Sequence, residues 1–114
     1  MGKTRVAVEF GMGTALRSED MTSACVRAVK DALWHNSLTI AQAFGQTVED
    51  MIVDVELACQ DPSAVDIDQV AAVFPYGQIA ITAQRGGLNI PKQDGGHTVV
   101  AHAAIIVSLH LEGS

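Results

Sequence analysis

Residues 98–109 read TVVAHAAIIVSL, the longest apolar strand that the sequence predicts in this chain of 114 residues. Successive side chains of a strand point to opposite faces, and here both faces are apolar. Because helices packed on one side of a sheet leave its second side open to water, we expect another subunit or sheet to cover that second side. One face has Val99, Ala101, Ala103, Ile105 and Val107, and the other has Val100, Ala104 and Ile106.

Three further strands are predicted from alternating apolar residues. Residues 5–10 alternate between apolar and other side chains and end at a glycine-rich turn at residues 11–13. Residues 50–60 form a longer strand with one strongly apolar face, and residues 78–84 form a shorter one. A repeat of two residues is typical of strands that are buried on one face.

Helices and one long loop separate these strands. A helix is predicted over residues 19–35, with Ser18 as its N-terminal cap and apolar residues at helical spacing. A shorter helix begins near residue 66 and ends at residue 74, and residues 38–44 add another helical piece. Residues 85–96 contain four glycines and a proline, so they are predicted to form a loop long enough to have a function.

The order β-α-β-α-β-β predicts a single α+β domain over residues 1–114. We expect a two-layer sandwich, a four-stranded sheet with helices on one face, in the style of ferredoxin-like or chorismate-mutase-like folds. Hydrophobic residues make up 48% of the chain, which is a high share for a body with so much surface. We therefore expect a homo-oligomer, with a trimer or another multiple favoured.

Composition excludes several classes of function. Thirteen acidic and seven basic residues give a formal charge of −6, which disfavours nucleic acid as a partner. The sequence contains no apolar run of the roughly 18 residues that cross a bilayer, so no membrane association is predicted. Cys25 and Cys59 fall inside predicted elements and are interpreted as reduced and buried. With no export signal apparent, we expect a cytoplasmic protein.

The glycine-rich turn after the first strand has two interpretations. Gly11 and Gly13 stand between a strand and a helix, where backbone amides bind phosphate in dinucleotide-binding folds. However, the third glycine of that fingerprint is missing, and Glu19 and Asp20 would oppose an anion. The other interpretation is that both glycines allow a positive φ or a close approach of two backbones.

Four short motifs are VAVEFGMGT at residues 6–14, VRAVKDAL at residues 26–33, PYG at residues 75–77 and GGL at residues 86–88. Together they resemble a small family of conserved hypothetical proteins, first catalogued from a listerial genome. The resemblance covers almost the whole chain and implies a bacterial cytoplasmic protein, without implying an activity. The N-terminal signature of that family has the form G-x-G-x-D-x-H-G. Gly11 and Gly13 match it, but Ala15, Arg17 and Ser18 stand at its Asp, His and final Gly positions.

His102 is the candidate for acid–base chemistry. It lies in the last strand, where it can meet Glu9, Asp54 or Glu56 across the sheet. A carboxylate beside an imidazole can move a proton near neutral pH. The alternative is an imidazole that packs in a subunit interface and binds a backbone carbonyl. His110 shares its strand but is about 26 Å away, too far to bind one metal with it. No metal site is therefore predicted within this strand, and the least favoured alternative for the protein is metal binding by His97 or His102 with carboxylates of a neighbouring chain.

The long loop supplies candidate anchors for a ligand. Arg85 and Gly86 together can bind a carboxylate, because the guanidinium donates two parallel hydrogen bonds and glycine lets the backbone approach. His97 follows at the end of the loop, and Arg17 offers a second cation near the glycine-rich turn. The alternative is that Arg85 and His97 are ordinary exposed side chains of a turn.

These observations lead to two hypotheses. In the first, an oligomer binds a small anionic or heterocyclic metabolite at subunit interfaces. Glu9, Glu56 and His102 would be its proton carriers, and no cofactor is predicted. In the second, the protein is a non-catalytic structural or accessory subunit of a larger assembly. The anchors of the first hypothesis are Gly11, Gly13, Arg17, Arg85, Gly86 and His97.

Overall fold

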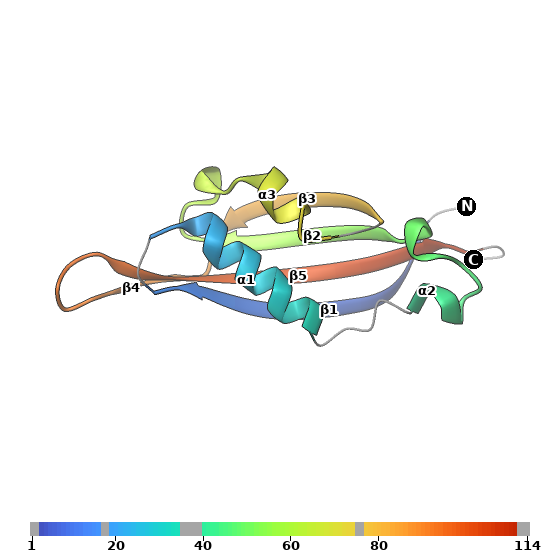
Figure 1. Ribbon diagram of the computed structural model, residues 1–114, viewed down its shortest axis with the longest axis horizontal. Helices are drawn as coiled ribbons and strands as arrows, with labels where there is room; N and C mark the ends of the chain where they lie inside the picture. The colour runs from blue at the N-terminus through green and yellow to red at the C-terminus, as the bar shows by residue number, and fades with distance from the viewer. Residues whose placement is uncertain (1–2, 17–18, 35–39, 75–76, 112–114) are drawn as a thin grey trace.

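The computed structural model describes residues 3–16, 19–34, 40–74 and 77–111. They form an elongated α+β body of 57 × 22 × 19 Å (Figure 1). The described part has no helix that is both long and apolar enough to cross a membrane. The strands are β1 (Lys3–Ala15), β2 (Ile52–Cys59), β3 (Gln78–Arg85), β4 (Leu88–Pro91) and β5 (His97–His110), and the helices are α1 (Met21–Trp34), α2 (Ile40–Ala43) and α3 (Ile67–Ala71).

The apolar C-terminal segment is the central strand of the sheet. β5 pairs antiparallel with β1 on one side, and with β2 and then β4 on the other, in the order β1-β5-β2-β3. The outermost pair, β2 and β3, is parallel. The prediction of a mixed α+β domain is confirmed, but the prediction of four strands is wrong. The fifth strand is β4, which lies in the segment expected to be a loop.

β4 forms because glycines supply the turns on both sides of it. Gly87 has a φ of 64°, a conformation that favours glycine, where the chain leaves β3. Gly95 and Gly96 also have positive φ values and return the chain into β5. The short apolar stretch at residues 88–91 then pairs with the start of β5 as a hairpin.

Helices cover one face of this sheet. α1 packs across β1 and β5, and α3 packs beside it (Figure 1). Every odd-numbered residue of β5 from Val99 to Leu109 is buried on this face. We call the other side, on which no described helix packs, the open face. Even-numbered residues of β2 and β5 point toward it, as the expected two-faced strand requires.

α1 contacts the backbone of β1 directly. A Cβ atom on Gly11 would lie 2.2 Å from the carbonyl oxygen of Ala28 and 2.4 Å from the amide nitrogen of Ala32. A Cβ atom on Gly13 would lie 2.3 Å from backbone atoms of both Ala24 and Ala28. Small residues on both elements therefore let the helix rest on the strand without intervening side chains.

Side chains of α1 also bind the outer edge of β1. The Asp31 carboxylate accepts a hydrogen bond from the amide of Met12 at 2.9 Å. One turn earlier, the Arg27 guanidinium donates to the carbonyl oxygen of Thr14. The helix thus satisfies backbone groups of an edge strand that would otherwise be free to pair with another strand.

Replacing a contact glycine should destabilise the fold. We expect Gly13→Ala to lower the free energy of unfolding by about 3 kcal/mol, because the added methyl group forces the helix away from the strand. Urea denaturation measures this change. Lys30→Ala is the control, since Lys30 is exposed on α1 and is not among the nearest neighbours of Gly13. A loss below about 0.5 kcal/mol in Gly13→Ala would contradict the close contact.

Asp20 should stabilise the start of α1 in a pH-dependent way. Its carboxylate accepts hydrogen bonds from Ser23 Oγ at 2.7 Å and from the Thr22 amide at 3.0 Å, whereas the predicted cap, Ser18, lies outside the described residues. The bond from Ser23 holds the pKa of Asp20 below its ordinary value. We expect Asp20→Ala to cost about 1 kcal/mol at pH 7.

This contribution should disappear in acid. A lowered folded-state pKa means that the stabilisation is complete above the unfolded-state pKa and is lost as pH falls through the folded-state pKa. Urea denaturation at pH 7 and at about pH 2.5 should therefore show the two proteins converging. Asp94→Ala, in the exposed hairpin turn, should show no such convergence, and a pH-independent difference for Asp20→Ala would sink the prediction.

Candidate functional site

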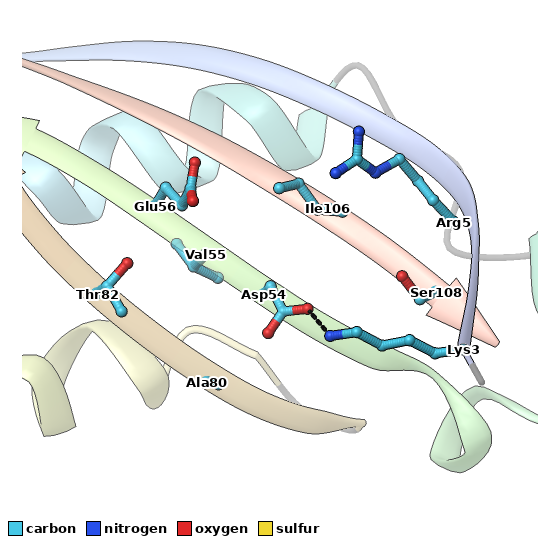
Figure 2. Close-up of a pocket in the computed structure, with 9 residues that line it drawn as sticks. All are labelled: Lys3, Arg5, Asp54, Val55, Glu56, Ala80, Thr82, Ile106 and Ser108. Carbon is cyan, nitrogen blue, oxygen red and sulfur yellow. Dashed lines mark hydrogen bonds and ion pairs between the residues drawn. The ribbon is translucent and has the colours of Figure 1, made fainter. Parts of the chain in front are cut away.

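A hollow of about 400 Å³ lies on the open face, near the start of β1 (Figure 2). Its side chains come from four neighbouring strands, β1, β5, β2 and β3. We call it the charged hollow, because two basic and two acidic residues stand around it with two hydroxyl groups. The residues that line it are Lys3, Arg5, Asp54, Val55, Glu56, Ala80, Thr82, Ile106 and Ser108.

A bulge in β1 brings the basic side chains to this face. The register between β1 and β5 shifts between Arg5 and Ala7. Arg5 pairs with Ser108 of the open face, whereas Ala7 pairs with Val107 of the buried face. Odd-numbered residues before the bulge therefore point to the open face, and those after it point to the helices.

The acidic side chains follow the regular alternation of β2. Asp54 and Glu56 lie opposite Ile106 and Ala104 of β5. On the far side, Glu56 pairs with Thr82 of β3. The two strands on either side of β5 thus contribute opposite charges to one hollow.

Only part of this charge is paired within the chain. Lys3 Nζ contacts Asp54 Oδ2 at 2.8 Å, as Figure 2 shows. Among the described residues, neither Arg5 nor Glu56 has a hydrogen bond or an ion-pair partner. Both side chains lie beside Ile106, on opposite sides of β5 (Figure 2). One guanidinium and one carboxylate are therefore available to a bound molecule.

The structure separates the three predicted proton carriers. Glu9 pairs with the buried Ile105, so it points to the helix side, whereas His102 is exposed on the open face. The expected meeting of Glu9 and His102 is therefore wrong, because the sheet lies between them. Glu56 does share a face with His102, as its diagonal neighbour, but no hydrogen bond joins these two side chains.

His102 instead belongs to a second, more apolar hollow of about 480 Å³. Phe10 and Met12 of β1 stand beside it, with Asp31 of α1 at the outer edge. Met12 is the direct cross-strand neighbour of His102. This hollow lacks the paired opposite charges of the charged hollow and has little polar lining.

Gly11 and Gly13 do not form a ligand-binding turn. Both lie within β1, which continues to Ala15, and both face the backbone of α1. The expected turn is therefore wrong, because the strand does not end there, and Gly11 is instead one of the residues that line the hollow around His102. Of the two interpretations left open by the sequence, the close approach of two backbones is the one observed. Arg17 lies outside the described residues.

The other predicted anchors also lie away from the charged hollow. Arg85 ends β3, and the carbonyl of Gly86 accepts a hydrogen bond from Gln60 Nε2 at 3.0 Å. The amide of His97 donates to Glu19 Oε1 at 2.7 Å, and its ring Nδ1 lies 3.5 Å from the same atom. Gly86 and His97 thus hold the β4–β5 hairpin in place through contacts within the chain.

The described residues show no group of three or more His, Cys, Asp or Glu side chains that could hold a metal ion. Cys25 and Cys59 are both free and buried, as expected. Burial, with a further contribution from the neighbouring Cys59, raises the pKa of Cys25 to about 12. At neutral pH Cys25 is therefore a protonated core residue and a poor nucleophile.

Sequence reasoning missed Lys3, Arg5, Thr82 and Ser108 as candidates. Asp54 and Glu56 alternate with buried apolar residues, and this spacing predicts two carboxylates on one face. Lys3 and Arg5 alternate in the same way, but nothing in the sequence marks the bulge that turns them to that face. The missing signal is thus a register shift in the backbone rather than a motif.

Comparison with known proteins gives a family and a fold relative. The chain is similar to a solved structure described as an FtsZ-like protein of unknown function from Nostoc punctiforme, with 28% sequence identity and a TM-score of 0.89. The match covers 96% of this chain and 98% of that one. No protein of curated function shows significant sequence similarity to the chain. The family model described as conserved hypothetical protein (Lin0512_fam) matches residues 5–107. The chain therefore belongs to this family of conserved hypothetical proteins.

Proposed function

We propose that this protein binds a small zwitterionic metabolite in the charged hollow. The observation that carries the proposal is the pair Arg5 and Glu56, two opposite charges on either side of β5 that have no partner among the described residues. The volume of about 400 Å³ falls within the usual range of small-molecule sites. The ligand would carry a carboxylate for Arg5 and an ammonium group for Glu56.

The chemistry of the two anchors sets the ligand class. A guanidinium binds a carboxylate through two parallel hydrogen bonds, and a carboxylate binds an ammonium group through charge-assisted ones. β1 and β2 lie two strand spacings apart, about 9.6 Å, with β5 between them. This separation favours a ligand whose charges are several bonds apart. Thr82 and Ser108 add hydroxyl groups to the same hollow.

The balance of charge supports a zwitterion rather than the anion expected from the sequence. Lys3 and Arg5 offset Asp54 and Glu56, so the hollow has no net formal charge. A simple anion would gain Arg5 but would be repelled by Glu56. A molecule with both charges satisfies both side chains.

The proposal is for binding rather than proton transfer. Glu56 lies in the charged hollow, but His102 lines the other hollow and Glu9 points to the opposite face. A general acid–base pair needs both groups within hydrogen-bond reach of the reacting atoms. Of the three proton carriers expected from the sequence, the charged hollow contains Glu56 alone, where it serves as a charged anchor.

A set of ω-amino acids tests this proposal. Glycine, 4-aminobutyrate and 6-aminohexanoate carry the same two charges at increasing separations, and butyrate and butylamine each carry only one. Titration of ¹⁵N-labelled protein should shift amide signals of Arg5, Glu56 and Thr82 with the longer amino acids, and much less with glycine or the single-charge compounds. If no compound shifts these signals at millimolar concentration, the hollow does not bind a zwitterion of this kind.

Neutral variants should weaken the binding. We expect Arg5→Gln and Glu56→Gln each to raise the Kd for the best ω-amino acid by at least about tenfold, because each removes one charge-assisted hydrogen-bonding group. Lys30→Gln on α1 and Glu49→Gln before β2 are matched controls, since each removes a like charge away from the hollow. Equal Kd values for the hollow variants and the controls would rule out the assigned anchors.

A second role, as a non-catalytic assembly subunit, is favoured by a different observation. Large apolar side chains stand exposed on the same open face, outside the charged hollow. These apolar side chains offer no charged or hydrogen-bonding group to a zwitterion. Their arrangement is the basis of the next proposal.

A further inference from the structure

We infer that the open face of the sheet binds a second copy of this chain. The inference goes beyond ligand binding and rests on the apolar side chains, so either proposal can fail without the other. A second copy would cover the second apolar face of β5. This face is the feature from which the sequence predicted an oligomer.

Four large apolar side chains form what we call the apolar strip: Phe10 and Met12 of β1, and Leu88 and Ile90 of β4. Their exposed fractions are 69%, 55%, 58% and 48%. Phe10 pairs with Ala104 and Leu88 pairs with Val100, so the strip spans β5 from both sides. Exposed apolar patches of this kind mark interaction sites on soluble proteins.

The distribution of charge favours a second copy as the occupant. The chain has a net charge of −6, yet the described strands present two basic and two acidic residues on the open face, which therefore is formally neutral. The acidic excess lies on the other surfaces. Two acidic copies repel each other least when they meet through their neutral faces. A strongly basic partner would instead be drawn to the acidic surfaces.

The free edge of β1 is poorly suited to pairing with another copy. The bulge between Arg5 and Ala7 interrupts its ladder, and Asp31 and Arg27 of α1 bind backbone groups at Met12 and Thr14. Bulges and covered backbone groups are common ways to block strand addition. Packing through the face is therefore favoured over extension of the sheet at β1.

The size of the open face is sufficient for a stable pair. A standard protein interface buries about 800 Å² on each partner. The molecule measures 57 × 22 Å across its broad side, so the sheet face has room for such a contact. In a two-fold dimer the same patch serves both copies, and only residues near the axis lie close to their own counterparts. We place this axis along the central strand β5, where Ala104 is the cross-strand neighbour of Phe10.

Molecular mass and a single substitution test the inference. Sedimentation equilibrium of the wild-type chain at 10–500 µM should give twice the monomer mass of 12.0 kDa. We expect Phe10→Asp to weaken the dimer at least about 100-fold, because each copy would bury an unpaired charge. Phe44→Asp is the matched control, since Phe44 is also exposed, at 46%, but follows α2. It should leave the mass unchanged.

Cross-linking identifies the face directly. Under mild oxidation, Ala104→Cys should form a disulfide between copies, two thiols losing two protons and two electrons to the added oxidant. Lys30→Cys on α1 should not, and the buried Cys25 and Cys59 do not compete. This readout also serves if Phe10→Asp fails to fold, as judged by circular dichroism.

The sedimentation and cross-linking results together decide whether the open face binds a second copy. A monomeric or trimeric wild-type mass, or a dimer that survives Phe10→Asp and does not cross-link at residue 104, would overturn the inference. The ω-amino acid titration distinguishes the two proposals. A monomer that still binds the ligand removes only the dimer, and a dimer that binds none removes only the metabolite.

Discussion

The direct contact of α1 with the backbone of β1 is the constraint on which the rest of the structure depends. Gly11 and Gly13 let the helix lie so close that a single added methyl group on either would overlap its main chain. At this distance Arg27 and Asp31 reach the outer edge of β1 and bind its backbone. One contact thus fixes the helix and closes part of an edge, and the described part of the chain places no helix on the opposite face of the sheet.

The bulge at Arg5–Ala7 determines what that opposite face carries. Without it, the alternation of β1 would point Lys3 and Arg5 toward the helix side with Ala7 and Glu9. With the bulge, Lys3 and Arg5 lie on the same face as Asp54 and Glu56. The hollow therefore contains four charged side chains whose formal charges sum to zero. The register shift therefore separates the two ends of the open face: a polar end that suits a zwitterion, and an apolar end that suits a protein surface.

The sequence predicted the positions of the strands and helices more accurately than which face of each strand is buried. Strong apolar repeats located β5, β2 and α1, because buried strands and helices differ in period. In β1 the same reasoning favoured Val6, Val8 and Phe10 as the buried side, yet Phe10 is exposed and Glu9 shares the helix side with Gly11 and Gly13. Glycine and alanine contribute little to an apolar repeat in the sequence, although their small size lets α1 pack directly on the backbone of β1. Local alternation also misses a bulge and a strand as short as β4, whose pairing depends on distant residues.

The half-kept signature and the charged hollow lie at opposite ends of β1. Ala15, which stands where the resembled signature has an Asp, is buried in the core against neighbouring apolar residues. A carboxylate there would need a partner to offset the loss of hydration, whereas alanine needs none. Position 15 therefore contributes packing in this chain, and it places no charge near a ligand. Arg5 and Glu56, which have no hydrogen-bond or ion-pair partner among the described residues, are on the other face, so the proposed binding in the charged hollow makes no use of position 15.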